Sequence, residues 1–215
     1  QSMQQMLLDT AVSPVAREAA DCASALFTAD GEVLAMSDAI PLLLGALPGQ
    51  MTALLDRYPR DSMRAGEIYV VNDPFSGGTH LPDIAVILPV FARERLIGFA
   101  TSLLHHQDVG GTRPGSVPPD AVEIFQEGLR LPPMRAGEGH RLSREVRELI
   151  AANSRAADTV LADLNAQVAA ARSAARGWSR IVDDLGVDGF LDAAADLLDA
   201  AEAETRATFA ALLPV

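Results

Sequence analysis

Two apolar runs joined by a short polar link constrain the fold of this chain more than any other feature. Residues 84–91 (IAVILPVF) and 96–105 (LIGFATSLLH) are almost entirely apolar, and only residues 92–95 (ARER) separate them. Apolar runs rich in Ile, Val and Phe with a short link between them are typical of a buried β-hairpin. We therefore expect a sheet that contains this hairpin, with further strands beside it.

Other patterns before residue 140 predict more strands and a few helices. Residues 67–72 (EIYVVN) predict a strand, and residues 20–37 predict two short strands around the turn Ala29-Asp30-Gly31. Residues 3–19 have helical spacing with a break at Pro14. A buried loop containing Pro41 and Gly45 is expected next, followed by a helix from about Pro48 to Tyr58.

The last third of the chain has a different, helical pattern. Ser143 is a suitable N-cap for a helix with a one-sided apolar stripe: Val146, Ile150, Ala157, Val160, Leu164, Val168 and Ala171. Gly177 and Gly186 predict breaks, and Asp188 is a candidate cap for a last helix. The prediction is an α+β fold: a mainly antiparallel sheet with helices over residues 1–140, then a helical extension, 141–215, packed on it or protruding.

Composition excludes several classes of function. The net charge is −12 with no basic block, which argues against a nucleic-acid partner. All 17 basic residues are arginine, so a Walker A loop or a Schiff-base lysine is absent from this sequence. The single cysteine, Cys22, excludes an internal disulfide, and we expect it to be a buried apolar residue rather than a nucleophile. With no apolar run of about 18 residues and no export signal, we expect a soluble cytoplasmic protein.

Histidine, aspartate and glycine concentrate between Asn72 and Gly111. His80 and Asp83 flank a turn at Pro82, and His105-His106 end the second apolar run, ahead of Asp108. Adjacent residues of a strand point to opposite faces, so only one of the two adjacent histidines can join a given site unless the strand has already ended. Two imidazoles with a carboxylate suit Zn²⁺, Mn²⁺ or Fe²⁺. The alternative is that these histidines are surface or hydrogen-bonded core residues.

The stretch after Gly111 is a long loop rich in Gly and Pro, of a length that is usually functional. Glu123, Glu127 and Arg130 lie close together in its EIFQEGLR segment. They could orient a substrate or form an ion pair on the surface. His140, in GEGHRL, has no neighbouring carboxylate cluster, and we expect it to be solvated.

Several long motifs resemble one family in continuous order over about residues 15–170. The segments NDPFSGGTHLPD, LLHHQDVGG, PGSVPPDAVEIFQEGLRLPP and ELIAANSR are similar to those of the hydantoinase B / 5-oxoprolinase family. The resemblance implies a metal-binding subunit of an ATP-dependent cyclic-amide hydrolase that works with a hydantoinase A-type partner in a hetero-oligomer. The partner would bind ATP, which the absence of lysine fits.

The resemblance also implies roles for individual residues. The metal ligands would be His80, Asp83 and His105, with Asp21 as a candidate fourth. His106 and Asp108 would orient a ligand or the substrate. Together with Glu127, taken from the interpretation of the EIFQEGLR segment above rather than from the resemblance, they are the candidate catalytic residues. Each of these positions matches a motif quoted above or, for Asp21, the segment ADCASALF.

The chain also departs from the family pattern. Where family members commonly have HIPVHLG, this chain has AIPLLLG, so Ala39 and Leu43 replace two histidines. Family chains generally continue past this length, so we expect a fragment or a shortened member. Two alternatives therefore remain: a subunit of an acetone-carboxylase-type enzyme, or a non-catalytic scaffold for the partner subunit.

Overall fold

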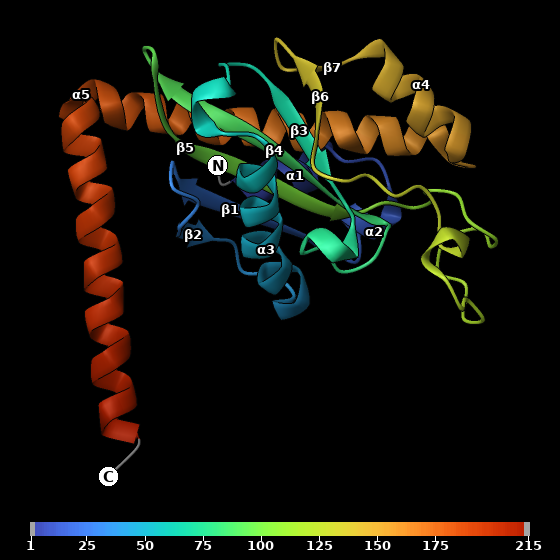
Figure 1. The fold of residues 1–215 in the computed structure, drawn as a ribbon, viewed down its shortest axis with the longest axis horizontal. Coiled ribbons are helices and arrows are strands. Elements are labelled where there is room, and N and C mark those ends of the chain that lie inside the picture. The colour runs from blue at the N-terminus through green and yellow to red at the C-terminus, as the bar shows by residue number, and fades with distance from the viewer. Residues whose placement is uncertain (1–2, 213–215) are drawn as a thin grey trace.

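The computed structural model describes residues 3–212 and confirms the α+β class (Figure 1). The strands form one antiparallel sheet in the order β2-β1-β5-β4-β3-β6-β7. Their bounds are β1 Cys22–Thr28, β2 Val33–Met36, β3 Ile68–Val71, β4 Asp83–Ala92, β5 Arg95–His105, β6 Met134–Glu138 and β7 Arg141–Leu142. The α-helices are α1 Met3–Thr10, α2 Pro14–Arg17, α3 Pro41–Arg57, α4 Arg144–Asn153 and α5 Ala157–Leu212.

The predicted hairpin of β4 and β5 is confirmed and lies at the centre of the sheet. Its pairing runs from Asp83 opposite His105 to Ala92 opposite Arg95. Strand β1 pairs along the free side of β5, and β3 pairs along the free side of β4. The strands predicted at 67–72 and around Ala29–Gly31 are confirmed as β3 and as β1 with β2.

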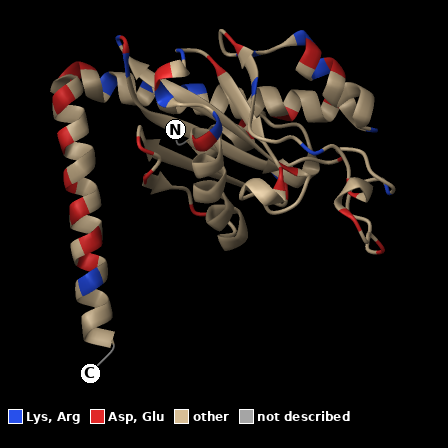
Figure 2. Cartoon of the chain, viewed as in Figure 1, with Lys and Arg blue, Asp and Glu red and all other residues tan. Residues whose placement is uncertain are grey.

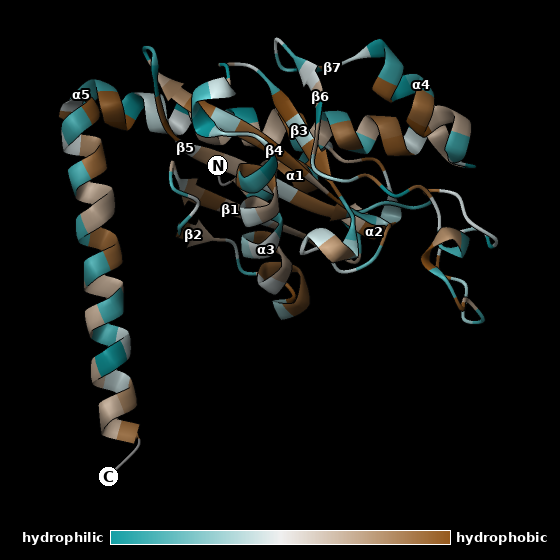
Figure 3. Cartoon of the chain, viewed as in Figure 1, coloured by the Kyte–Doolittle hydropathy of each residue, from teal (hydrophilic) through white to brown (hydrophobic). Residues whose placement is uncertain are grey.

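The sheet has apolar side chains on both faces, because helices cover both. Odd-numbered residues such as Ala85, Ile87 and Phe99 pack with Leu47 and Met51 of α3. Even-numbered residues of the same strands pack with Val160, Leu164 and Val168 of α5. The central strands are correspondingly hydrophobic along their length (Figure 3), as expected for strands buried on both faces.

The predicted start of the helix near Pro48 was wrong. Helix α3 begins at Pro41, where a proline suits the first turn, and it continues through Pro48. Leu43 and Leu47 of this segment are buried against the sheet, and their burial outweighs the cost of an interior proline. The expected loop containing Pro41 and Gly45 is therefore helical.

The helical third also differs in detail from the prediction. Ser143 does cap α4, since its hydroxyl accepts a hydrogen bond from the Val146 N–H. However, the stripe belongs to two helices, because the chain turns between Asn153 and Ala157. Gly177 lies inside α5 without breaking it, whereas Gly186 has non-helical backbone angles and kinks the helix as predicted. The short strands β6 and β7 were not predicted.

Helix α5 consists of two parts that differ in their environment. The part before Gly186 crosses one face of the sheet, and the part after it, which we call the arm (residues 187–212), projects away from the sheet (Figure 1). Phe190 packs on Trp178 near the kink, with ring centroids 5.1 Å apart. Acidic residues recur along the arm (Figure 2). The division into domains at residue 140 stays a prediction.

None of the helices within residues 3–212 combines the length and the hydrophobicity required to span a membrane.

Candidate metal centre

The loop between β3 and β4 is held by a buried asparagine. The Asn72 amide donates to the carbonyls of Leu81 and Leu129 and accepts from the Leu131 N–H. Asp73 next accepts from the Phe75 N–H and starts a single 3-10 turn, Pro74–Ser76. These contacts fix both ends of the loop that carries His80.

Glycine lets this loop pass directly against α3. Gly77 has φ = 85°, and a Cβ there would lie 2.4 Å from the Gly49 carbonyl carbon. Gly49 is also restricted, though less severely, because its own Cβ would lie 3.0 Å from the Gly77 Cα. The loop and the helix are thus in contact backbone to backbone, which leaves no space for a side chain at Gly77.

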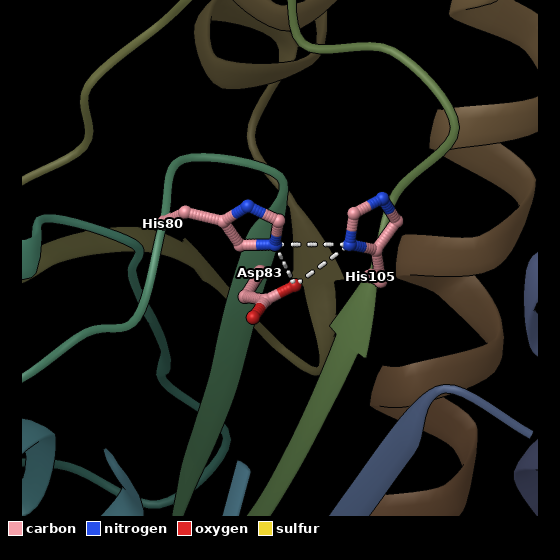
Figure 4. Close-up of side chains that lie close together, drawn as sticks. All are labelled: His80, Asp83 and His105. Atoms are coloured by element: carbon pink, nitrogen blue, oxygen red, sulfur yellow. Dashed lines mark hydrogen bonds and ion pairs between the residues drawn. The ribbon is translucent and has the colours of Figure 1, made fainter. Parts of the chain in front are cut away.

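Three of the predicted ligands come together beyond this contact (Figure 4). The Asp83 Oδ1 atom lies 2.9 Å from His80 Nε2 and 3.0 Å from His105 Nδ1, and the two ring nitrogens are 3.0 Å apart. His80 comes from the loop, whereas Asp83 and His105 are register partners at the end of the β4–β5 ladder. The hairpin therefore brings together two residues that are 22 positions apart in the sequence.

The Asp83 carboxylate is buried and strongly hydrogen-bonded. Burial alone would raise its pKa, but hydrogen bonds from His105, His80 and Thr79 outweigh it and hold the pKa well below its usual value. The hydrogen bond to Asp83 in turn raises the pKa of His80, against the opposing effect of burial. The Thr79 hydroxyl donates to Oδ2 and leaves Oδ1 facing the imidazoles.

Asp21 lies at the margin of this cluster. It directly precedes β1, which pairs with β5, and its Oδ2 atom is 3.8 Å from His105 Nδ1. Its side chain is partly exposed, unlike that of Asp83. The 3.8 Å separation is too long for a hydrogen bond, so Asp21 lies next to the cluster rather than within it.

His106 faces the opposite side of the sheet from His105, as the alternation of strand residues predicts. It is completely buried, and its Nε2 atom lies 2.9 Å from Oε1 of Gln167 in α5. Burial lowers the pKa of His106 to about 4, so the ring is neutral at pH 7. Its predicted role near the substrate stays a prediction, although its contacts are with core residues.

Asp108 is held by a different set of groups. Its carboxylate accepts from the N–H groups of Gly110, Gly115 and Arg155 and from the Arg155 guanidinium. The same guanidinium donates to the carbonyls of Gly110, Gly111 and Arg113. Asp108 and Arg155 together fasten the glycine-rich loop to the turn between α4 and α5. A catalytic role for Asp108 stays a prediction.

Glu127 is partly exposed, and Glu123 and Arg130 are exposed. The charge of Glu127 contributes to the raised pKa of His80, after the larger effect of Asp83. Arg130 approaches Asp73, at 3.9 Å, and lies over the Phe125 ring at 5.7 Å rather than pairing with either glutamate. The sequence allowed two interpretations: substrate orientation or a surface ion pair among Glu123, Glu127 and Arg130. The contacts of Arg130 argue against the ion pair.

Three residues of this region were given no role by the sequence patterns, although two of them, Thr79 and Arg155, lie within the family-like segments. Thr79, Arg155 and Gln167 each bind a predicted site residue, but only Thr79 is its near neighbour in sequence. Arg155 and Gln167 lie 47 and 61 positions from the residues they contact. Such partners can be recognised only when the pairing of the strands with the helices is known.

One of the two positions that depart from the family pattern lies in the core, and the other lies at its margin. Leu43 is buried in the first turn of α3, and Ala39 packs against the same apolar cluster on that face of the sheet. A cavity of about 630 Å³ lies on the other face, between Leu26, Met36 and Trp178. Its position on the opposite face separates it from the histidine cluster.

An antiparallel sheet with two imidazoles and one carboxylate at the end of its central hairpin defines a protein with a candidate divalent-metal site. The family model described as Hydantoinase B/oxoprolinase matches residues 1–214. The chain belongs to this family.

Relatives and solved structures agree with this assignment. The solved structure of an ATP-dependent caprolactamase from Pseudomonas jessenii superposes with a TM-score of 0.89 and 32% identity, covering 96% of this chain and 35% of that one. A 5-oxoprolinase of Dictyostelium discoideum is 30% identical over 87% of this chain and 15% of its own length. The delta subunit of acetophenone carboxylase of Aromatoleum aromaticum is 31% identical over 87% of this chain and 28% of its own. The chain thus spans about a third or less of these proteins.

Proposed function

We propose that this chain is the metal-binding part of a subunit of an ATP-dependent cyclic-amide hydrolase, acting with a hydantoinase A-type partner that binds ATP. The convergence of His80, Asp83 and His105 within 4.8 Å is the observation that carries the proposal. The similarity to proteins named caprolactamase and 5-oxoprolinase supports the substrate class, a cyclic amide.

The three donor atoms are better arranged to bind a divalent cation than to form hydrogen bonds with one another. If both imidazoles donate an N–H to Asp83 Oδ1, their two N–H groups face each other across 3.0 Å. A cation bound to deprotonated ring nitrogens removes this repulsion. The three donor atoms lie 2.9–3.0 Å from one another, close enough that one cation would contact all of them.

Each residue has a definite task in this proposal. His80, Asp83 and His105 would hold the ion, Thr79 orients the Asp83 carboxylate, and Asp21 is positioned to approach as a fourth ligand. A Zn²⁺, Mn²⁺ or Fe²⁺ ion there would lower the pKa of a bound water or polarise the amide carbonyl. His80 is the most exposed of the three, so substrate would approach from its side.

Metal analysis of the purified chain tests this proposal directly. We expect wild type to retain close to one equivalent of Zn, Mn or Fe after dialysis, and His80→Ala to lose most of it, because removing one of three ligands opens the site. His140→Ala is the matched control, since His140 lies outside the cluster. Equally low metal in wild type and His80→Ala would rule the proposal out.

A carboxylase subunit is the second candidate, favoured by the similarity to acetophenone carboxylase. The same metal site would serve either reaction. The purified chain together with an A-type partner should be assayed for ring opening of a hydantoin or lactam and, separately, for fixation of bicarbonate. ATP-dependent ring opening without fixation supports the hydrolase.

A non-catalytic scaffold is the third candidate, motivated by apolar Ala39 and Leu43. It predicts that the chain binds the A-type partner but that turnover of the complex does not depend on His105. A loss of rate in His105→Ala with the complex still assembled would exclude it.

A further inference from the structure

Gln167 is a buried amide on the face of the sheet that lies away from the histidine cluster. It is 0% exposed. Its Nε2 atom donates to the carbonyls of Ile84, at 2.9 Å, and Ser102, at 2.8 Å, and its Oε1 atom lies 2.9 Å from His106 Nε2. A primary amide has two N–H donors and one carbonyl, so each of its polar groups has a partner.

These partners fix the orientation of both side chains. The Ile84 and Ser102 carbonyls can only accept, so the Gln167 NH₂ group must face them and its oxygen must face His106. His106 Nε2 must therefore carry the proton that is donated to Gln167. One buried side chain on α5 thus joins β4, β5 and the residue that follows β5.

Two of the residues that Gln167 contacts are direct sequence neighbours of the two predicted ligands on the strands. Ile84 follows Asp83, and His106 follows His105. Asp83 and His105 form the last pair of the β4–β5 ladder, and just beyond them the His106 N–H donates to the Pro82 carbonyl at 2.8 Å. Gln167 adds to this backbone link a contact one residue from each ligand, with the Ile84 carbonyl on β4 and with the His106 side chain just after β5, and it also holds the Ser102 carbonyl on β5.

We propose that Gln167 is a positioning residue that holds Asp83 and His105 at the separation required to bind the metal ion. The inference rests on the proposed metal-binding function. Groups behind the ligands of a metal site typically alter affinity when removed, because they fix the orientation of the ligands. Gln167 would act in this way from across the sheet, through the backbone rather than through a bond to a ligand side chain.

The test compares Gln167→Met, which keeps the volume but removes the hydrogen bonds, with Glu67→Gln. Glu67 is also buried and has two side-chain partners, Tyr69 and Arg135, but it directly precedes β3, at the end of that strand opposite to the cluster. We expect Gln167→Met to raise the Kd for Zn²⁺ and Mn²⁺ about 10- to 100-fold, measured against a chromophoric chelator. Glu67→Gln should leave both values unchanged.

A second readout does not require metal. The chain has four histidines, so their ring nitrogen signals can be resolved by NMR in metal-free protein. We expect a single Nε2–H tautomer for His106 in wild type, and altered His80 and His105 signals in Gln167→Met only. Should Gln167→Met fail to fold, Gln167→Asn keeps the amide but is one methylene too short to reach all three partners.

The outcomes separate the two proposals. Unchanged ring signals and unchanged Kd values in the Gln167 variant would overturn the positioning role, and so would equal changes in Glu67→Gln. If wild type binds neither metal but the Gln167 variant alters the His80 and His105 signals, the metal-binding function fails while the positioning role stands.

Discussion

At the scale of single residues, three buried carboxylates are stabilised in three different ways. Glu67 accepts from Tyr69 and Arg135, Asp83 from two imidazoles and Thr79, and Asp108 mainly from backbone N–H groups and Arg155. All three have lowered pKa values despite burial, which acts in the opposite direction. Of the three, only Asp83 has metal-ligating side chains as its partners, and this distinguishes a candidate site from structural ion pairs.

Glu67 makes the stability of the fold depend on pH. Burial would raise its pKa, but hydrogen bonds from Arg135, Tyr69 and the Arg64 N–H hold it below the usual value. Such a group contributes stability above its unfolded pKa, about 4.3, and that stability is lost as pH falls through the folded pKa. We expect the free energy of unfolding to decrease below about pH 4.3, and less steeply in Glu67→Gln.

Urea denaturation of both proteins at a series of pH values measures this difference. An equally steep decrease in wild type and Glu67→Gln would show that Glu67 is not the group responsible.

At the scale of elements, the sequence was informative wherever apolar runs were long. The β4–β5 hairpin and the opposite orientation of His105 and His106 follow from periodicity alone. The start of α3 could not be predicted from periodicity. Gly45 and Pro48 ordinarily break helices, and only burial against the sheet outweighs their unfavourable effect on the helix. Strand β6, with the sequence MRAGE, has no run of apolar residues to mark it, and β7 has only two residues.

In the candidate site, too, some residues could be predicted from the sequence and others could not. His80, Asp83 and His105 carry recognisable chemistry and a recognisable spacing in the sequence. Gln167 is one polar residue on an alanine-rich helix, and the atoms it binds belong to strands 61 or more positions away. Supporting residues of this kind depend on tertiary packing, which periodicity does not reveal.

The backbone contact between α3 and the His80 loop gives a prediction about Gly77. We expect Gly77→Ala to destabilise the fold and weaken metal binding, because it combines a positive φ with a clash against Gly49. Gly115→Ala is the matched control, because Gly115 has φ = 84° but no atom within 4 Å of the position of a Cβ. This substitution should lower the free energy of unfolding only by the backbone strain, about 1–2 kcal/mol.

Urea denaturation and the Kd for Zn²⁺ measure both effects. If Gly77→Ala is no more destabilising than Gly115→Ala and binds Zn²⁺ as wild type does, the close contact does not position the loop.

At the scale of the whole molecule, the kink at Gly186 separates a packed half of α5 from an exposed one. Trp178, before the kink, lies against Gly98 of β5, where a Cβ would come within 2.7 Å of the indole. Beyond Phe190 the arm is largely exposed, including Leu197, Phe209 and Leu212. The Arg95–Asp188 ion pair joins the tip of the central hairpin to the base of the arm.

The arm also determines how the molecule moves through solution. Residues 187–212 extend for ~39 Å at ~1.5 Å per residue, so the particle is angular rather than spherical. Its friction is therefore greater than that of a sphere of 22.7 kDa, and a monomer should leave a sizing column early, at the volume of a larger protein. Light scattering measures molar mass independently of shape. It therefore distinguishes an extended monomer from a true dimer.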